Sequence, residues 1–155
     1  MSTAVEYRLN NASAEQIAEH LLRCNTDFLP LLSGRVNIKD YAQKIVSKAT
    51  RFEAWSGGML VGLVAAYCND QEKRIAYITS VSVMNERAGK GIAARLMKQC
   101  IEYVKASGMR QVSLEVAESN APAIRLYEKI GFVIGKANAP FVGLDLFLKS
   151  GEAHE

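Results

Sequence analysis

The fold of this chain is decided by Val81-Ser82-Val83-Met84-Asn85-Glu86-Arg87-Ala88-Gly89-Lys90-Gly91-Ile92-Ala93-Ala94-Arg95-Leu96-Met97. Its β-branched start predicts a strand, its two glycines predict a turn, and the residues after them predict a helix. Apolar side chains recur at helical spacing through Ile92, Ala93, Leu96, Met97, Cys100, Ile101 and Val104. One face of this helix should therefore pack on a sheet, which fixes the position where the helix begins.

The turn before the predicted helix has the properties of a phosphate site. A helix N-terminus leaves its first backbone N–H groups without partners and carries a partial positive charge. Gly89 and Gly91 would let a ligand approach the main chain, and Arg87 and Lys90 would add positive charge. A glycine-x-glycine turn can also be only a tight connection, so the motif alone leaves both interpretations open.

The composition is that of one ordinary globular domain. The chain has 155 residues, of which 49% are hydrophobic and 23% charged, and we expect a single domain over residues 1–150 with a frayed tail at 151–155. The net charge of +3 gives no reason to expect nucleic acid as a partner. Cys24, Cys68 and Cys100 lie in apolar patterns, which favours reduced thiols, and no segment resembles a signal peptide or membrane helix. We therefore expect a cytoplasmic protein that does not bind membranes.

The order of the expected helices and strands predicts an α+β fold with a mixed sheet of about seven strands. A capping box at Ser13 and Gln16 starts the first helix, and Asn37 caps the second. Gly57-Gly58 predicts a hairpin turn, and Asn120 precedes the last helix. The expected strands are residues 4–9, 51–56, 59–67, 74–84, 111–117, 133–135 and 141–148. An antiparallel meander should therefore be followed by a β-α-β-α-β half, whose first two strands are parallel.

A second motif extends from Leu114 to Phe132 and is the more specific of the two. Asn120 and Tyr127 are seven residues apart, so they project from nearly the same side of a helix. Together they could line an extended ligand. Taken singly, Asn120 is also a good helix cap and Tyr127 also fits the apolar stripe of the helix.

These motifs together resemble those of the GNAT superfamily of acyl-CoA-dependent N-acetyltransferases. Gly89-Lys90-Gly91-Ile92-Ala93 is similar to its pyrophosphate loop, and Asn120-x-x-Ala123-x-x-Leu126-Tyr127-x-x-x-Gly131-Phe132 is similar to its second cofactor motif. One departure is Ala88, at a position where the superfamily usually has arginine or glutamine. Leu114-Glu115-Val116 and Ser119-Asn120-Ala121 are also similar to segments of bacterial ribosomal-protein N-terminal alanine acetyltransferases.

The resemblance implies an enzyme that moves an acetyl group from acetyl-CoA to a primary amine by direct attack in a ternary complex, without a metal. It implies a sheet whose fourth strand bulges at Val81 to Val83 and splays from the fifth strand to admit the cofactor. Tyr127 would be the general acid and Glu115 the base, with Glu118 as an alternative base. The implied cofactor-binding residues are Val81, Ser82, Val83, Gly89, Lys90, Gly91, Ile92, Ala93, Ala94, Asn120 and Tyr127.

The acceptor is expected on the opposite side, between the loop at residues 28–36 and the hairpin strands. Phe28, Arg35 and Tyr67 are the candidate contacts, and Arg35 could pair with a carboxylate of the acceptor or form a surface salt bridge. The acceptor amine could belong to a small molecule or a peptide. A homodimer is compatible with the sequence.

Two other functions fit parts of the sequence. Gly89-x-Gly91-x-x-Ala94 also fits a dinucleotide fingerprint, with Glu115 at a suitable distance for a ribose contact, which would make the protein an oxidoreductase. The preceding antiparallel hairpin argues against that interpretation. The other alternative is a non-catalytic acyl-CoA-binding sensor or assembly module, which Ala88 favours.

Overall fold

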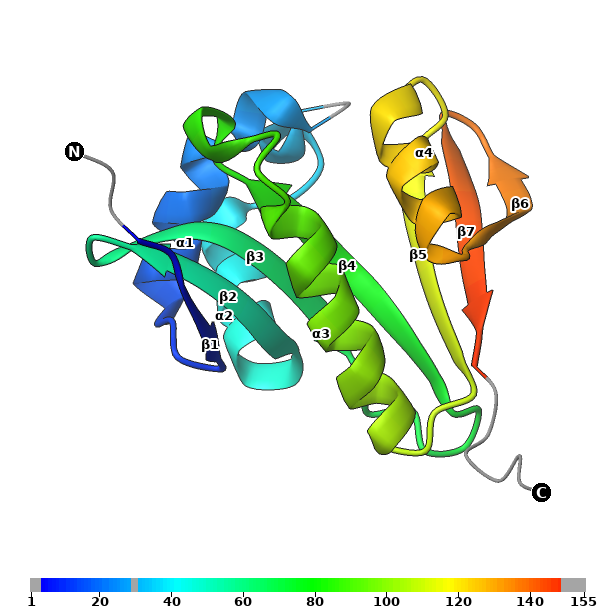
Figure 1. The fold of residues 1–155 in the computed structure, drawn as a ribbon. Coiled ribbons are helices and arrows are strands. Elements are labelled where there is room, and N and C mark those ends of the chain that lie inside the picture. The colour runs from blue at the N-terminus through cyan, green and yellow to red at the C-terminus, as the bar shows by residue number, and fades with distance from the viewer. Residues whose placement is uncertain (1–3, 29–30, 149–155) are drawn as a thin grey trace.

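The computed structural model describes residues 4–28 and 31–148, and within these ranges it contains one seven-stranded sheet flanked by four α-helices (Figure 1). The strands are β1 (Glu6–Leu9), β2 (Thr50–Ser56), β3 (Met59–Tyr67), β4 (Ile75–Val83), β5 (Gln111–Ala117), β6 (Val133–Asn138) and β7 (Phe141–Phe147). The helices are α1 (Ala14–Arg23), α2 (Ile38–Lys48), α3 (Ile92–Ala106) and α4 (Ala121–Ile130). Three short 3-10 turns are η1 (Asn25–Asp27), η2 (Leu32–Gly34) and η3 (Asn85–Arg87).

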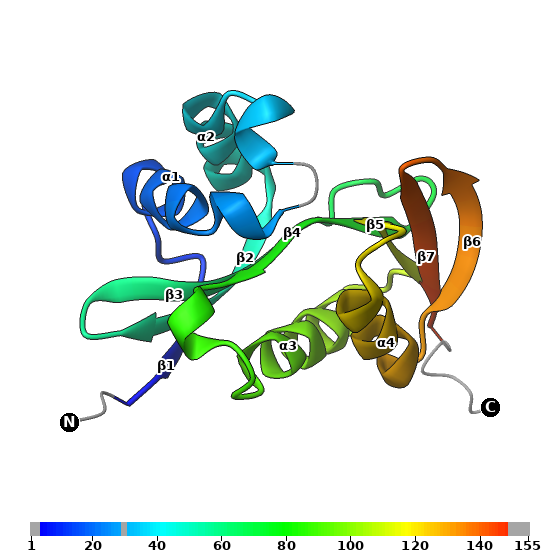
Figure 2. The same ribbon diagram turned by 90° about the horizontal axis from the view of Figure 1, so that it is seen from above.

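The strand order is β1-β2-β3-β4-β5-β7-β6, which confirms the predicted mixed sheet. Strands β1 to β4 form an antiparallel meander, β5 is parallel to β4, and β7 pairs antiparallel with both β5 and β6. Helices α1 and α2 cover one face of the sheet, and α3 and α4 cover the other (Figure 2). None of the described helices is long and apolar enough to cross a membrane.

A separate apolar core forms on each face of the sheet, because residues in the central strands alternate between the two faces. The core under α1 and α2 includes Ile17, Leu21, Ala42, Ile45, Leu63 and Ala65. The core under α3 includes Val64, Leu96, Met97, Cys100, Val104 and Leu114. The predicted stripe of α3 is largely confirmed, although Ala93 and Ile101 are only half-buried.

The local signals in the sequence form as predicted. The Ser13 hydroxyl accepts from the Gln16 amide at 3.1 Å, and the Gln16 side chain accepts from the Ser13 amide at 2.9 Å. Asn37 caps α2 by accepting from the Asp40 amide at 3.0 Å. The hairpin turn has φ values of 57° and 76° at Gly57 and Gly58, which glycine adopts without steric cost.

Three details differ from the sequence-based expectation or lie beyond it. The sixth strand extends to Asn138 rather than ending at Gly135, because its pairing with β7 resumes after a register shift. The connection before α2 contains the turns η1 and η2, which the sequence did not predict. The expected tail at 151–155 lies outside the described residues.

All three cysteines are free thiols, as predicted.

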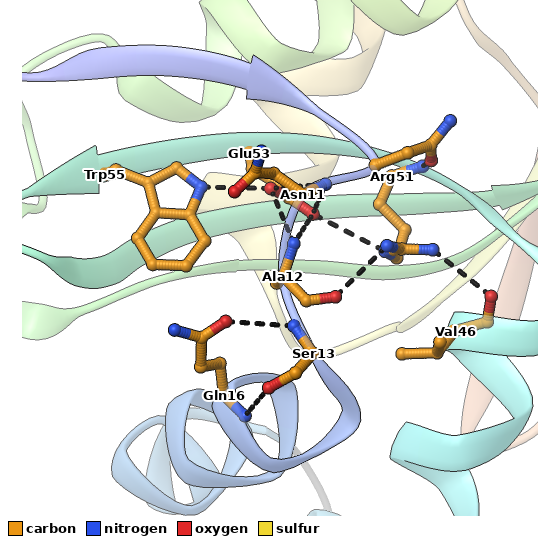
Figure 3. A network of polar contacts seen from close by, with 9 residues as sticks. Asn11, Ala12, Ser13, Gln16, Val46, Arg51, Glu53 and Trp55 are labelled. Carbon is orange, nitrogen blue, oxygen red and sulfur yellow. Dashed lines mark hydrogen bonds and ion pairs between the residues drawn. The ribbon is translucent and has the colours of Figure 1, made fainter.

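A buried carboxylate fastens the first strand and helix to the sheet. Glu53 on β2 is fully buried, and its oxygens accept from the backbone amides of Asn11 and Ala12 at 3.0–3.2 Å and from the Trp55 indole at 2.9 Å (Figure 3). Arg51 lies 3.4 Å from the same carboxylate and donates to the Ala12 carbonyl. A buried charge or amide that loses its partner costs free energy. Breaking these hydrogen bonds would therefore destabilise the fold, and they hold the β1–α1 connection in place.

His20 forms a second buried polar contact, between α1 and the sheet. Its side chain is 1% exposed, with Nδ1 2.9 Å from the Leu60 carbonyl and Nε2 2.9 Å from the Ser82 hydroxyl. Burial lowers the pKa of His20 to about 4, so the ring is neutral near pH 7. A carbonyl can only accept, so Nδ1 carries the proton and Nε2 accepts from Ser82.

We expect acid to destabilise the fold through His20. Between pH 6.5 and about 4 the unfolded chain protonates this ring while the folded protein keeps it neutral, so the free energy of unfolding falls as the pH drops. The loss over that interval amounts to about 3 kcal/mol. Urea denaturation of the wild type and H20Q measures it, and the wild type should lose more stability between these pH values. Equal pH dependence in the two proteins would contradict this assignment.

Candidate active site

Strands β4 and β5 are paired over only three residues and then separate. Their parallel register joins Ile75 to Gln111, Ala76 to Val112 and Tyr77 to Ser113, whereas β4 continues to Val83 and β5 to Ala117. Strand β5 remains paired with β7 along its whole length, so it diverges from β4 together with β7 (Figure 1). The predicted splay between the fourth and fifth strands is confirmed.

A β-bulge marks the point where β4 turns away. Ala65 pairs with Ser80 and Ala66 with Ile78, so Thr79 is an extra residue on β4. The resemblance placed the bulge at Val81 to Val83, and the structure corrects its position to Thr79. The Tyr41 hydroxyl on α2 lies 2.7 Å from the Thr79 carbonyl and 2.6 Å from its side-chain oxygen, which fixes the bulge from the α2 side.

A cleft of about 770 Å³ occupies the splay. It is lined mainly by residues 77–83 of β4, residues 114–117 of β5, one side of α4 up to Tyr127, and the connection between α1 and α2. Because α4 and the α1–α2 connection lie on opposite faces of the sheet, the cleft has walls on both faces (Figure 2). Such a passage can bring two ligands together from opposite sides.

The edge of β4 offers backbone donors to this cleft. The Met84 amide donates to the Val61 carbonyl on β3 at 2.8 Å. Amides in an antiparallel ladder alternate between the two sides of the strand, so the amide of Ser82 also faces β3 while those of Val81 and Val83 face the cleft. Two of the three predicted amide donors are therefore directed into the gap. Ser82 instead brings its hydroxyl, whose proton is donated to His20, so the oxygen can only accept from a ligand.

The N-terminus of α3 lies beside the same end of β4. Gly89 and Gly91 both have φ of +79°, a left-handed conformation that favours glycine, and no described side chain caps the helix. A β-carbon on Gly62 of β3 would lie 2.9 Å from Ile92 Cγ2, so a glycine there lets the start of α3 approach the sheet. The first amides of the helix are thus available to an anion.

The structure divides the predicted loop residues by environment. Ala93 lines the cleft and Ile92 is 4% exposed, with its side chain in the core. The remaining loop residues are exposed and lie outside the cleft lining; they are Gly89, Lys90, Gly91 and Ala94. Arg87, expected to add charge at the loop, donates to the Ser56 hydroxyl on β2 at 2.8 Å.

Helix α4 forms the wall of the cleft on the α3 side of the sheet. Asn120 is its cap, accepting from the Ala123 amide at 3.3 Å, and it also lines the cleft. Tyr127 lines the cleft as well, is 6% exposed and contacts the Phe132 ring edge-on with centroids 5.9 Å apart. Burial raises the pKa of Tyr127 to about 12, so its hydroxyl keeps its proton at neutral pH. The tyrosine can therefore act as a proton donor.

Glu115 lies on the opposite face of β5. Its neighbours Leu114 and Val116 belong to the core under α3, so alternation along the strand directs Glu115 toward the face covered by α1 and α2. Glu115 is exposed and lines the cleft, and its charge contributes to the raised pKa of Tyr77, after the larger effect of burial. The proposed acid and base thus line the same passage from opposite faces.

Two of the three predicted acceptor contacts line the cleft on this face. Phe28 and Arg35 are part of its wall, whereas Tyr67 is not; the Tyr67 ring lies 5.3 Å from the Lys44 ammonium. The sequence missed Tyr41, Tyr77 and Phe141, which complete the wall. Tyr41 fitted the apolar stripe of a predicted helix, and Tyr77 fitted a predicted strand. The sequence around each residue gave no sign that both would line the same cleft. No group of three His, Cys, Asp or Glu among the described side chains is arranged to hold a metal ion.

The chain is similar to known acetyltransferases in sequence and fold. A family model described as "Acetyltransferase (GNAT) family" matches residues 14–132. N-alpha-acetyltransferase MAK3 of Arabidopsis thaliana is 33% identical over 86 residues, which are 55% of this chain and 45% of that protein. The chain thus spans about half the length of this curated relative.

Solved structures share the whole fold at low identity. The ribosomal-protein-S18-alanine N-acetyltransferase from Escherichia coli has a TM-score of 0.75 at 16% identity, over 94% of this chain and 95% of that one. The PaiA N-acetyltransferase from Thermoplasma acidophilum, solved in complex with coenzyme A, has a TM-score of 0.72 at 15% identity, over 94% and 99%. With a family match over most of its length and this splayed sheet, the chain belongs to the acetyltransferase (GNAT) family.

Proposed function

We propose that this protein transfers an acetyl group from acetyl-CoA to a primary amine by direct attack, as an enzyme and not only as a binding module. The observation that carries the proposal is the cleft between β4 and β5, which has backbone donors on one edge and Tyr127 on its wall. The acceptor is a small-molecule or peptide amine. A location in the cytoplasm agrees with the three free thiols, which persist in reducing compartments.

The cofactor would enter from the side of α3 and α4. The first amides of α3, from Gly89 to Ala94, would bind its diphosphate, where the helix dipole favours negative charge. The backbone-like pantetheine arm would then lie in the splay, beside Asn120 and the unpaired edge of β4. The residues present fit this ligand, although Ala88 supplies no charged side chain to the diphosphate.

The amides of Val81 and Val83 would polarise the thioester carbonyl. Donors fixed by a strand need no reorganisation as charge develops, which is the condition for strong electrostatic stabilisation. Tyr127 would give its proton to the departing sulfur. Its high pKa keeps the hydroxyl protonated until that moment.

Glu115 would accept the proton of the attacking amine. A lysine-type ammonium with a pKa near 10.4 must lose its proton at a cost of about 4–5 kcal/mol at pH 7. Glu115 faces the acceptor half of the cleft and can act directly or through a water molecule. The Ser82 oxygen, which can only accept, offers the amine a second hydrogen bond.

A homodimer would use the exposed edge of the sheet. All of β6 is exposed, and Val133 and Ile134 are 52% and 55% exposed. An edge strand of this kind can pair with a second copy. This assembly is not required by the proposed site.

The direct test is release of free thiol from acetyl-CoA in the presence of a panel of amines, combined with calorimetry of acetyl-CoA binding. We expect micromolar to millimolar binding and amine-dependent thiol release. Binding without transfer to any amine would support the acyl-CoA-binding module. Failure to bind acetyl-CoA, with binding of NAD, would overturn the proposal altogether.

The substitution Y127F should slow turnover without disturbing the fold. It removes only the hydroxyl and keeps the edge contact with Phe132, so the expected loss is about 10²–10⁴ in kcat with little change in the Kd for acetyl-CoA. Steady-state kinetics and calorimetry on the same preparation separate these effects. An unchanged kcat would remove Tyr127 from the mechanism.

The substitution E115Q should lower kcat most at neutral pH. Without the base, the amine must lose its proton to solvent, so the deficit should shrink as the pH approaches the amine's own pKa. The measurement is the ratio of wild-type to variant kcat from pH 7 to 10. E118Q, in the exposed loop after β5, tests the alternative base in the same assay. A ratio independent of pH, or the same effect in E118Q alone, would contradict the role of Glu115.

A further inference from the structure

The acceptor half of the cleft carries opposite charges that do not neutralise each other. We propose that the acceptor is an amino acid with an apolar side chain, whose free carboxylate is bound by Arg35 while its amine faces Glu115. This inference rests on the proposed acetyl transfer and names the class of acceptor. It concerns Arg35, Glu115 and the aromatic residues around them, which lie on the α1–α2 face.

Arg35 is exposed, and its guanidinium contacts an aromatic ring on the opposite side of the cleft. It follows η2, and its guanidinium lies 5.4 Å from the centre of the Phe141 ring on β7. Phe141 pairs with Ala117 at the end of β5. The Arg35–Phe141 contact therefore joins the α1–α2 connection to the β5–β7 side of the cleft. Stacking on an aromatic face restrains the guanidinium and leaves its edge donors for a planar anion.

Arg35 contacts an aromatic ring but pairs with no carboxylate among the described residues. Arg8, Arg23 and Arg51 form ion pairs within 4.0 Å, whereas Arg35 forms none with the residues in 4–28 and 31–148. The surface salt bridge considered for Arg35 is therefore not formed there. A guanidinium that lines a cleft without a carboxylate partner is suited to bidentate binding of a ligand carboxylate.

Glu115 supplies the opposite charge in the same half of the cleft. Both groups act on Tyr77, since Glu115 raises the pKa of this tyrosine and Arg35 opposes that effect, yet the two side chains form no ion pair. A ligand that carries an ammonium and a carboxylate matches this arrangement. Asp27 is the other acid in the lining; its charge contributes to the raised pKa of Cys24, and it forms no ion pair with Arg35.

The lining of the cleft also contains apolar and aromatic side chains from this face. They include Phe28, Leu32, Val36, Tyr77 and Phe141. The Tyr41 hydroxyl is already hydrogen-bonded to Thr79, so Tyr41 offers a ligand mainly its aromatic ring. A polar chain such as a polyamine would gain little here, whereas an apolar side chain would bury its surface.

The test compares acceptors that differ only at the carboxylate. L-phenylalanine, L-phenylalaninamide and 2-phenylethylamine share the ring and the amine. The amide is the harder competitor, because its α-amino group is less basic and so is neutral more often at pH 7 than that of the amino acid. A preference for the amino acid must therefore come from binding.

We expect kcat/KM for L-phenylalanine to exceed that for the amide by about 10- to 100-fold, the range for a charge-assisted hydrogen bond. R35Q should abolish this preference mainly through KM, and R35K should keep part of it, because lysine retains the charge without the fork. R23Q is the matched control, since Arg23 is an exposed arginine outside the cleft. Equal or better turnover of the amide by the wild type, or an unchanged preference in R35Q, would overturn the inference.

A binding measurement distinguishes failure of the inference from failure of the proposed function. Calorimetry with N-acetyl-L-phenylalanine and its amide, in the presence of coenzyme A, needs no turnover. The acid should bind to the wild type and lose affinity about 10-fold or more in R35Q but not in R23Q. If no amine is acetylated but this pattern holds, acetyl transfer is wrong and the carboxylate site stands. Equal affinity for acid and amide would reject the site whatever the activity.

Discussion

The structure depends on β5 pairing fully with β7 but only briefly with β4. A strand inside a sheet normally satisfies its backbone groups on both sides, and unpaired buried groups are costly. Beyond Tyr77 and Ser113 the facing edges of β4 and β5 have no such partner in each other. An extended ligand with its own amide groups can supply the missing hydrogen bonds, which is why the gap suits a pantetheine arm better than a compact molecule.

Several contacts keep these edges apart. The bulge at Thr79 turns β4, and the Tyr41 hydroxyl holds the bulge from α2. Helix α3 packs on the meander at Gly62, while α4 lies over β5 and β7 (Figure 2). The sheet therefore consists of two halves with their own helices, and the cleft is the seam between them. In the first half, the buried Glu53 contacts hold the β1–α1 connection to β2 (Figure 3).

The sequence predicted what local patterns determine. Caps at Ser13 and Asn37, the Gly57-Gly58 turn and the α3 start each depend on residues within a few positions, and all are confirmed. The contacts it missed join distant segments: His20 to Ser82, or Arg35 to Phe141. The sequence around a histidine on an apolar helical face does not indicate which distant residue will form a hydrogen bond with it. The position of the bulge was wrong by two residues or more because it depends on pairing with β3.

The chemistry of the cleft lining favours direct attack over an acyl-enzyme. Cys24 is the cysteine in the lining, and burial raises the pKa of its thiol to about 12, so it is a poor nucleophile at neutral pH. The Ser82 hydroxyl does contact a histidine, but the low pKa of His20 makes that ring a weak proton acceptor. Tyr127 and Glu115 line the passage from opposite faces of the sheet, so the thioester can enter from one face and the attacking amine from the other. An amine that attacks from its own face needs no covalent relay through the protein.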